Sequence, residues 1–120
     1  MKRIALLVAA ASLAAPAFAQ PAPPPQLSLE HKMLLRCSAA FALVANRQAA
    51  GDADALQYPP LEERGREFFV RSSARVMDEA KLDRAAIEAA LTVEAQSLLQ
   101  AGAVRAVMPV CLSVLDASER

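Results

Sequence analysis

The chain has 120 residues, with 13 basic and 13 acidic side chains, two cysteines, one histidine and no tryptophan. Its formal net charge of zero argues against the strongly basic surface by which many proteins attach to nucleic-acid phosphates, so we expect no nucleic-acid partner. The length suits a single small domain with one hydrophobic core.

Residues 1–19 have the three parts of a secretory signal peptide. Lys2 and Arg3 precede an apolar run, which ends in the small residues Ala17 and Ala19. We expect cleavage after Ala19. The alternative, a retained transmembrane anchor, is disfavoured because the run is short and contains a proline. The sequence therefore predicts a periplasmic or secreted protein with no stable membrane insertion after cleavage.

Residues 20–27 follow as a proline-rich tether. The stretch "QPAPPPQ" favours an extended backbone, because proline fixes φ and lacks an N–H donor. The alternative is a ligand for a proline-recognising module. Residues 28–120 then form the predicted single α-helical domain.

The first predicted helix starts after Ser28, a good N-cap, and ends near Ala50, where Gly51 can terminate it. The second starts at Pro59 and Pro60, which suit a first helical turn. The buried faces of these two helices follow from helical spacing. They are Leu34, Cys37, Phe41 and Val44 in the first, and Leu61, Gly65, Phe68, Phe69, Ser72 and Val76 in the second, with Val70 and Met77 at its edge.

The second helix should end near Lys81, and Asp83 is a good N-cap for a third. Gly102 weakens the helical pattern, and Pro109 either kinks the last helix or separates two. We therefore predict an all-α fold, a small bundle of three or four helices. The inner faces expected for the last two segments are Ile87, Leu91, Ala95 and Leu98, and then Val107, Val110, Cys111 and Val114.

Cys37 and Cys111 are predicted to form one disulfide that fastens the first helix to the last. An exported protein with two cysteines usually oxidises them. The alternatives are pairing between protomers and a redox site, but the two residues are not in the Cys-x-x-Cys arrangement of redox enzymes. A zinc or haem site is disfavoured because the chain has only two cysteines and one histidine and lacks Cys-x-x-Cys-His.

Few other residues suggest chemistry. We expect His31 to face solvent, since no second histidine exists to complete a metal site with Met33. Arg71 and Arg75 are weak anion-binding candidates, against which stand the i, i+4 pairs Glu62–Arg66 and Glu67–Arg71 of an ordinary solvated face. No catalytic or phosphate-binding motif is present, so we predict no catalytic residue, no metal, no cofactor and no enzymatic activity.

The leading functional prediction is a periplasmic protein that acts through contacts with an unknown protein partner, in a stress-related or chaperone-like role. Tyr58, Phe68 and Phe69 are the candidate interaction surface, because consecutive phenylalanines on a helix point in different directions. The alternative is that both phenylalanines are buried. Two other functions stay open: a carrier of an apolar small molecule between its helices, and an inhibitor or immunity partner of a periplasmic enzyme. The sequence does not specify the oligomeric state.

In size, compartment and cysteine number the chain resembles the small two-cysteine helical acid-stress chaperones of the bacterial periplasm. The resemblance rests on no shared motif and implies no site residue. It implies that acidification loosens the domain and exposes an apolar surface that prevents other proteins from aggregating.

Overall fold

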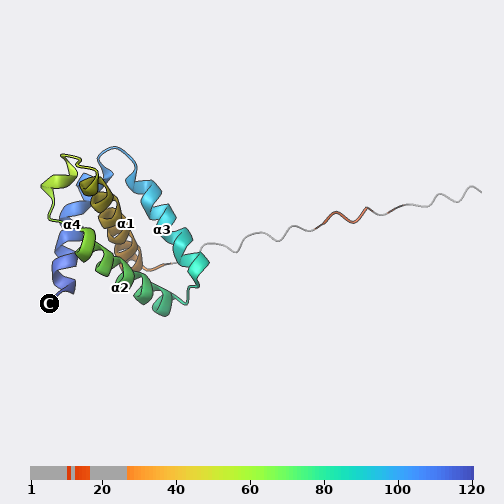
Figure 1. The fold of residues 1–120 in the computed structure, drawn as a ribbon. Helices are drawn as coiled ribbons and strands as arrows, with labels where there is room; N and C mark the ends of the chain where they lie inside the picture. Colours follow the sequence, from red (N-terminus) through yellow and green to blue (C-terminus); the bar gives the residue numbers. More distant parts are fainter. Residues whose placement is uncertain (1–10, 12, 17–26) are drawn as a thin grey trace, which may run out of the picture.

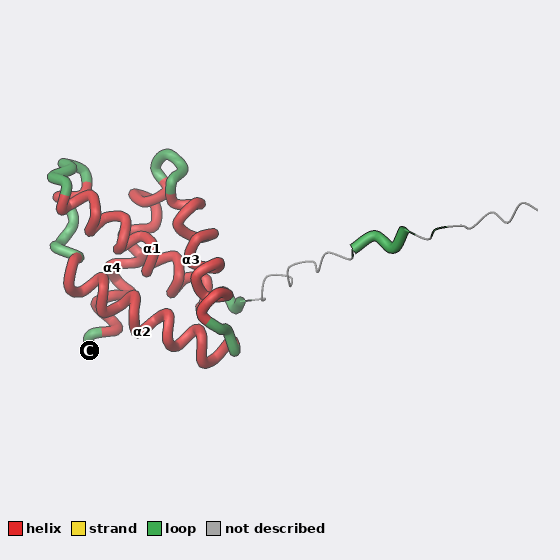
Figure 2. The backbone as a smooth tube through the Cα atoms, turned by 45° about the vertical axis from the view of Figure 1, so that its right-hand side comes forward, coloured by secondary structure: helices red, strands yellow, loops and turns green. Residues whose placement is uncertain are grey.

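The computed structural model describes residues 11, 13–16 and 27–120, so most of the predicted signal peptide and tether lies outside the described residues. The described part contains four α-helices and no strand (Figures 1 and 2). The prediction of an all-α bundle is thus confirmed, with four helices. The elements are α1 (Leu29–Ala49), the 3-10 helix η1 (Ala55–Gln57), α2 (Glu62–Ala80), α3 (Arg84–Leu98) and α4 (Ala103–Ser118).

Local capping residues set several helix ends. Ser28 Oγ accepts a hydrogen bond from the His31 N–H (3.0 Å) before α1, and Asp83 Oδ1 accepts one from the Ala86 N–H (2.8 Å) before α3. Lys81 ends α2 in a left-handed conformation, with φ of 56°. These ends agree with the predicted ones, because each depends on residues within one helical turn.

Helix α1 is central and packs against each of the other three helices. Of its predicted inner face, Cys37, Phe41 and Val44 are buried, whereas Leu34 is half-buried and Leu35 is buried instead. The Phe41 and Phe68 rings meet edge to face with their centroids 5.2 Å apart. This aromatic pair joins α1 to α2 in the main core.

Two side chains, Gln48 and Asp52, bond to the backbone of the connection between α1 and α2, and Gln48 makes the larger number of contacts. Its amide nitrogen Nε2 lies within hydrogen-bond distance of the backbone oxygens of Ala55 (3.1 Å), Tyr58 (3.2 Å) and Pro59 (2.9 Å). Its oxygen Oε1 accepts from the N–H of Leu61 (3.1 Å), just before α2 begins. A single glutamine thus contacts four polar backbone groups of a connection that has little secondary structure.

Helix α4 continues through Pro109 as one helix, which settles the alternative left open by the sequence. Pro109 is exposed, so its ring and its missing N–H face away from the core. The prediction that Val110 faces inward is wrong: it is 44% exposed. The inner face of α4 contains Cys111 and the buried residues one or two helical turns from it: Val104, Val107, Met108 and Leu115.

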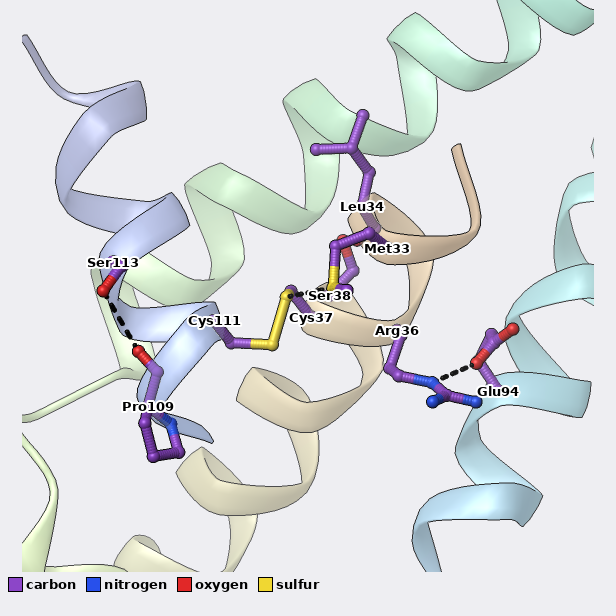
Figure 3. Close-up of a disulfide and its surroundings, with 9 residues drawn as sticks. All are labelled: Met33, Leu34, Arg36, Cys37, Ser38, Glu94, Pro109, Cys111 and Ser113. Atoms are coloured by element: carbon purple, nitrogen blue, oxygen red, sulfur yellow. Dashed lines mark hydrogen bonds and ion pairs between the residues drawn. A yellow bond between two sulfur atoms is a disulfide. The ribbon is translucent and has the colours of Figure 1, made fainter. Parts of the chain in front are cut away.

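The predicted disulfide is confirmed. Cys37 of α1 and Cys111 of α4, which are 74 residues apart, are both fully buried and their Cα atoms are 5.2 Å apart (Figure 3). Met33 Sδ lies 3.8 Å from Cys37 Sγ and packs against the bond. The first helix and the last are therefore covalently joined inside the core.

Within the residues that the structure describes, no helix combines the length and apolar character that a membrane crossing requires.

Candidate functional site

A shallow groove of about 740 Å³ lies between α1, α2 and α4. We call it the apolar groove. Its polar residues are Glu30, Arg71, Ser72, Arg75 and Ser118. Its apolar residues come from all three helices: Leu29, Met33, Leu34, Phe68, Val114 and Ala117.

Helical spacing explains how α1 and α4 build the walls of this groove. Leu29 and Met33 are four residues apart in α1 and so lie on one face of the helix. Val114 and Ala117 are three residues apart in the last turns of α4, so they also lie on one face of their helix. Leu29 is 81% exposed, so the groove presents a large apolar side chain to solvent at one end.

The structure does not bring Tyr58, Phe68 and Phe69 together on one exposed surface. Phe68 is only 2% exposed because it packs on Phe41, so it is a core residue that contributes to the groove lining. Phe69 is half-buried and is not among the groove residues. Tyr58, also half-buried, lines a different hollow of the molecule. For Phe68 the structure therefore supports the alternative of a buried side chain.

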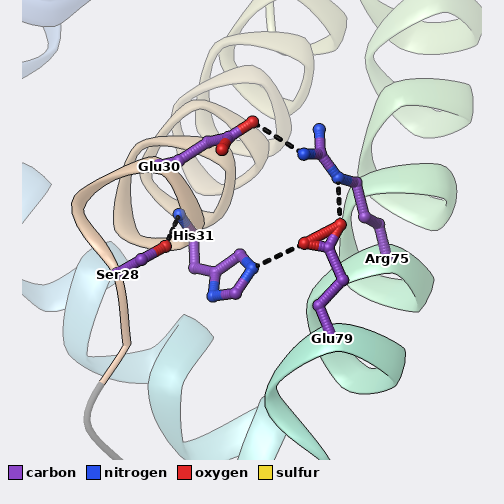
Figure 4. Close-up of polar contacts among 5 residues, drawn as sticks. All are labelled: Ser28, Glu30, His31, Arg75 and Glu79. Carbon is purple, nitrogen blue, oxygen red and sulfur yellow. Dashed lines mark hydrogen bonds and ion pairs between the residues drawn. The ribbon is translucent and has the colours of Figure 1, made fainter.

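At one end of the apolar groove, a polar cluster bridges α1 and α2 (Figure 4). Arg75 Nε donates to Glu79 Oε1 (2.5 Å), and the Arg75 Nη2 group donates to Glu30 Oε1 (2.7 Å). His31 Nε2 lies 3.0 Å from Glu79 Oε2 and hydrogen bonds to it. A carboxylate has only acceptors, so this ring nitrogen is the donor.

Hydrogen bonding in this cluster favours the charged forms of its acid and base. The bonds from His31 and then from Arg75 lower the pKa of Glu79 below its ordinary value. The bonds to Glu79 and Glu30 raise the pKa of Arg75. Both groups are solvent-exposed, so we assign the cluster no large share of the folding free energy.

One prediction about these residues needs correction: His31 does not face solvent, because its side chain is 13% exposed and it joins α1 to a carboxylate 48 residues away. Anion binding by Arg75 stays a prediction, against which stands the donation of its guanidinium to two carboxylates. Arg71 is exposed in the groove and has no ion-pair partner among the described residues.

Further ion pairs join helices that are distant in sequence. Arg64 of α2 donates to Asp116 (2.8 Å) and, through two nitrogens, to Glu119 (2.9 and 2.8 Å) at the end of α4. These bonds raise the pKa of Arg64 and lower that of Glu119. Arg36 of α1 pairs with Glu94 of α3 (2.9 Å).

The i, i+4 pairs expected on α2, Glu62–Arg66 and Glu67–Arg71, are not formed. Sequence spacing identifies neighbours within a helix, but the interhelical partners depend on packing. No motif in the sequence indicated them.

The two cysteines and the histidine of the described residues are already engaged in contacts within the domain. Both cysteines are held in the disulfide, and no group of three or more histidine, cysteine, aspartate or glutamate side chains there could hold a metal ion. The His31 ring already forms a hydrogen bond to Glu79. The apolar groove is thus the feature of this part of the chain that best fits a function.

No protein-family model matches the chain, and no curated protein and no solved structure is significantly similar to it.

Proposed function

We propose that the protein is exported to the periplasm and acts there, without catalysing a reaction, by holding an apolar segment of another protein in the apolar groove. The observation that carries this proposal is the groove itself, open to solvent and lined by apolar side chains from three helices. Exposed contiguous apolar surface on a small domain commonly marks a contact site.

Two features support export. The sequence of residues 1–19 has the composition of a signal peptide. The buried Cys37–Cys111 bond is typical of proteins that fold in an oxidising compartment.

The shape and charge of the groove favour a protein segment over a small molecule. The hollow is shallow and open rather than enclosed, and an amphipathic helix laid along it could place apolar side chains against Met33 and Val114. Arg71, which has no carboxylate within ion-pair distance among the described residues, borders the groove. A segment with apolar residues and a nearby acidic residue would complement both features.

A chaperone-like role is the form of this function that we favour. Interhelical ion pairs tie the walls of the groove together: Arg75 with Glu30 joins α1 to α2, and Arg64 with Glu119 joins α2 to α4. Protonation of the carboxylates would weaken these pairs and allow α2 to move away from α1 and α4, which the disulfide keeps joined. Acidification would then enlarge the apolar surface available to a client protein.

Light scattering of citrate synthase as it aggregates on heating tests the proposal, with the oxidised protein added at neutral and at acidic pH. We expect the protein to suppress scattering, more strongly at acidic pH. The variant Leu29→Glu with Ala117→Glu should lose this effect, because both exposed side chains line the groove. The matched control, Ala89→Glu with Val93→Glu on the exposed face of α3, should retain it.

Absence of suppression by the unmodified protein, or equal loss in both variants, would contradict the proposal. A native mass spectrum of protein purified from the periplasm tests the alternative that the protein carries a small molecule. A small molecule retained there, and displaced by the groove substitutions, would show that the groove holds a small molecule instead of a protein segment.

A further inference from the structure

A second hollow, of about 350 Å³, lies at the other end of α1 from the apolar groove. We call it the arginine pocket. It is formed by the end of α1, by η1, by the connection between α3 and α4, and by the start of α4. Its apolar residues include Val44, Ala55, Leu98, Leu99 and Val104.

Two arginines from different helices line this pocket. Arg47 belongs to the last turn of α1, and Arg105 belongs to the first turn of α4. Neither has a carboxylate within ion-pair distance among the described residues, unlike Arg64 and Arg75. Asp54 is the one acid in the lining, so the charged side chains of the pocket sum to +1 (two arginines less one aspartate).

The backbone at the start of α4 adds further donors. The N-cap is Gly102, which has no side chain to accept hydrogen bonds from the first turn. The Ala103 N–H donates to Gln100 O (3.1 Å), but within the described part of the chain the N–H groups of Val104 and Arg105 have no acceptor. Unpaired N–H groups at a helix start favour an anion, and here they add to the two guanidinium groups.

Tyr58 completes the polar lining. It is half-buried and packs against the main core, and Gln48 fixes its backbone by donating to the Tyr58 carbonyl (3.2 Å). Its position is thus set by the connection between α1 and α2, and its hydroxyl provides one more donor. The pocket combines positive charge and donors with an apolar lining.

We infer that the arginine pocket binds a small organic acid, with the carboxylate held by Arg47 and Arg105 and the hydrocarbon part against Val44 and Leu98. Two guanidinium groups match the oxygens of a carboxylate. The volume falls within the range of small-molecule sites. An inorganic anion would leave the apolar lining unused. This site is separate from the apolar groove and does not depend on the function proposed for it.

A titration of the isotope-labelled, oxidised protein, followed by NMR at constant ionic strength, tests this inference. The probes are benzoate, which has an apolar ring, and inorganic phosphate, which has none. We expect benzoate to produce saturable shifts of the Val104 and Arg105 amide signals and to bind at least fivefold more tightly than phosphate. Arg47→Gln and Arg105→Gln should each weaken benzoate binding at least fivefold.

Arg66→Gln is the matched control, since Arg66 is exposed on α2 and also has no carboxylate partner among the described residues. It should leave the benzoate titration unchanged, as should the groove variant Leu29→Glu with Ala117→Glu. Three results would each overturn the inference: shifts that do not saturate, equal weakening by Arg66→Gln, or phosphate binding as tightly as benzoate. Far-UV circular dichroism of each variant checks that the helices are intact.

Discussion

Gly65 of α2 lies so close to Phe41 of α1 that a Cβ atom added to the glycine would be 3.0 Å from the phenylalanine Cβ. Phe41 Cβ is attached directly to the backbone of α1, so a rotamer change cannot relieve this contact. The two helices therefore approach as closely as they do because residue 65 has no side chain.

Gly65→Ala should lower the free energy of unfolding by up to about 2 kcal/mol. Overpacking the contact with Phe41 costs about 1–3 kcal/mol, and the higher helix propensity of alanine offsets about 1 kcal/mol of this cost. Urea denaturation measures the difference. The control is Ala74→Gly at an exposed position of the same helix, which measures the difference in helix propensity between alanine and glycine without a packing change. A more stable Gly65→Ala protein would contradict the close approach.

Reduction of the Cys37–Cys111 bond should cost about 4 kcal/mol of unfolding free energy, since it releases a closed loop of 74 residues in the unfolded chain. Urea denaturation with and without reductant measures the change, and the double variant Cys37→Ala with Cys111→Ala should behave like the reduced protein. This variant should also be insensitive to reductant. Unfolding midpoints unaffected by reduction would contradict a structural role for the bond.

Gln48→Leu should destabilise the protein by about 1–3 kcal/mol, because it leaves backbone groups between Ala55 and Leu61 without their partners. The side-chain volume is nearly unchanged, so the loss isolates the hydrogen bonds. Thermal denaturation followed by circular dichroism measures it. The control is Gln96→Leu at an exposed position of α3, expected to change stability by less than about 0.5 kcal/mol. Equal effects of the two substitutions would show that Gln48 does not hold the connection.

Stability should fall on acidification because the pKa values of Glu79 and Glu119 are lowered in the folded protein. A lowered pKa means that the unfolded chain binds protons more tightly. The two carboxylates therefore contribute their full stabilisation at pH values above 4.5, the ordinary pKa of the carboxyl group in the unfolded chain. This stabilisation is lost as the pH falls through their lower pKa values in the folded protein. Urea denaturation between about pH 5 and pH 3 should show this decline.

Glu79→Gln and Glu119→Gln should each make the decline of stability with pH shallower. Glu67→Gln should not, because Glu67 is exposed and forms no ion pair within the described residues. If the stability of all three variants depended on pH in the same way, groups other than Glu79 and Glu119 would be responsible for the loss of stability in acid.

Ser73→Ala should stabilise the protein by about 1 kcal/mol. Among the described residues, Ser73 Oγ is the buried side-chain oxygen or nitrogen without a hydrogen-bond partner, and an unsatisfied buried hydroxyl carries a desolvation cost. Differential scanning calorimetry measures the change. Ser38, whose buried Oγ donates to the Leu34 carbonyl (2.7 Å), is the comparison: Ser38→Ala removes a satisfied hydroxyl and should bring no such gain. A less stable Ser73→Ala protein would indicate an unseen partner for this hydroxyl.

The features that could be predicted from sequence are those decided within about one helical turn. Ser28 and Asp83 cap helices through N–H groups three residues away, so the residue type and its position suffice to place the helix start. The disulfide was predictable for another reason: with two cysteines in the chain, one intramolecular pairing is available.

The features that could not be predicted depend on how the helices pack. The carboxylate that binds His31 is 48 residues away, and those that bind Arg64 are more than 50 away. Val110 shares a helical spacing with inward-facing residues, but packing rotates α4 so that Met108 is buried instead. The apolar groove and the arginine pocket each need side chains from several helices, so no local pattern indicates either one.

Because of the disulfide, a cut in the chain between Cys37 and Cys111 would not by itself separate the two resulting fragments. The exposed connection near Asp52, between α1 and α2, lies within the segment that Cys37 and Cys111 enclose. A protease that cuts there would produce two fragments that still migrate as one molecule until a reductant is added. In an oxidising compartment a nicked copy would keep α1 bound to α4, so proteolytic damage alone would not release either piece.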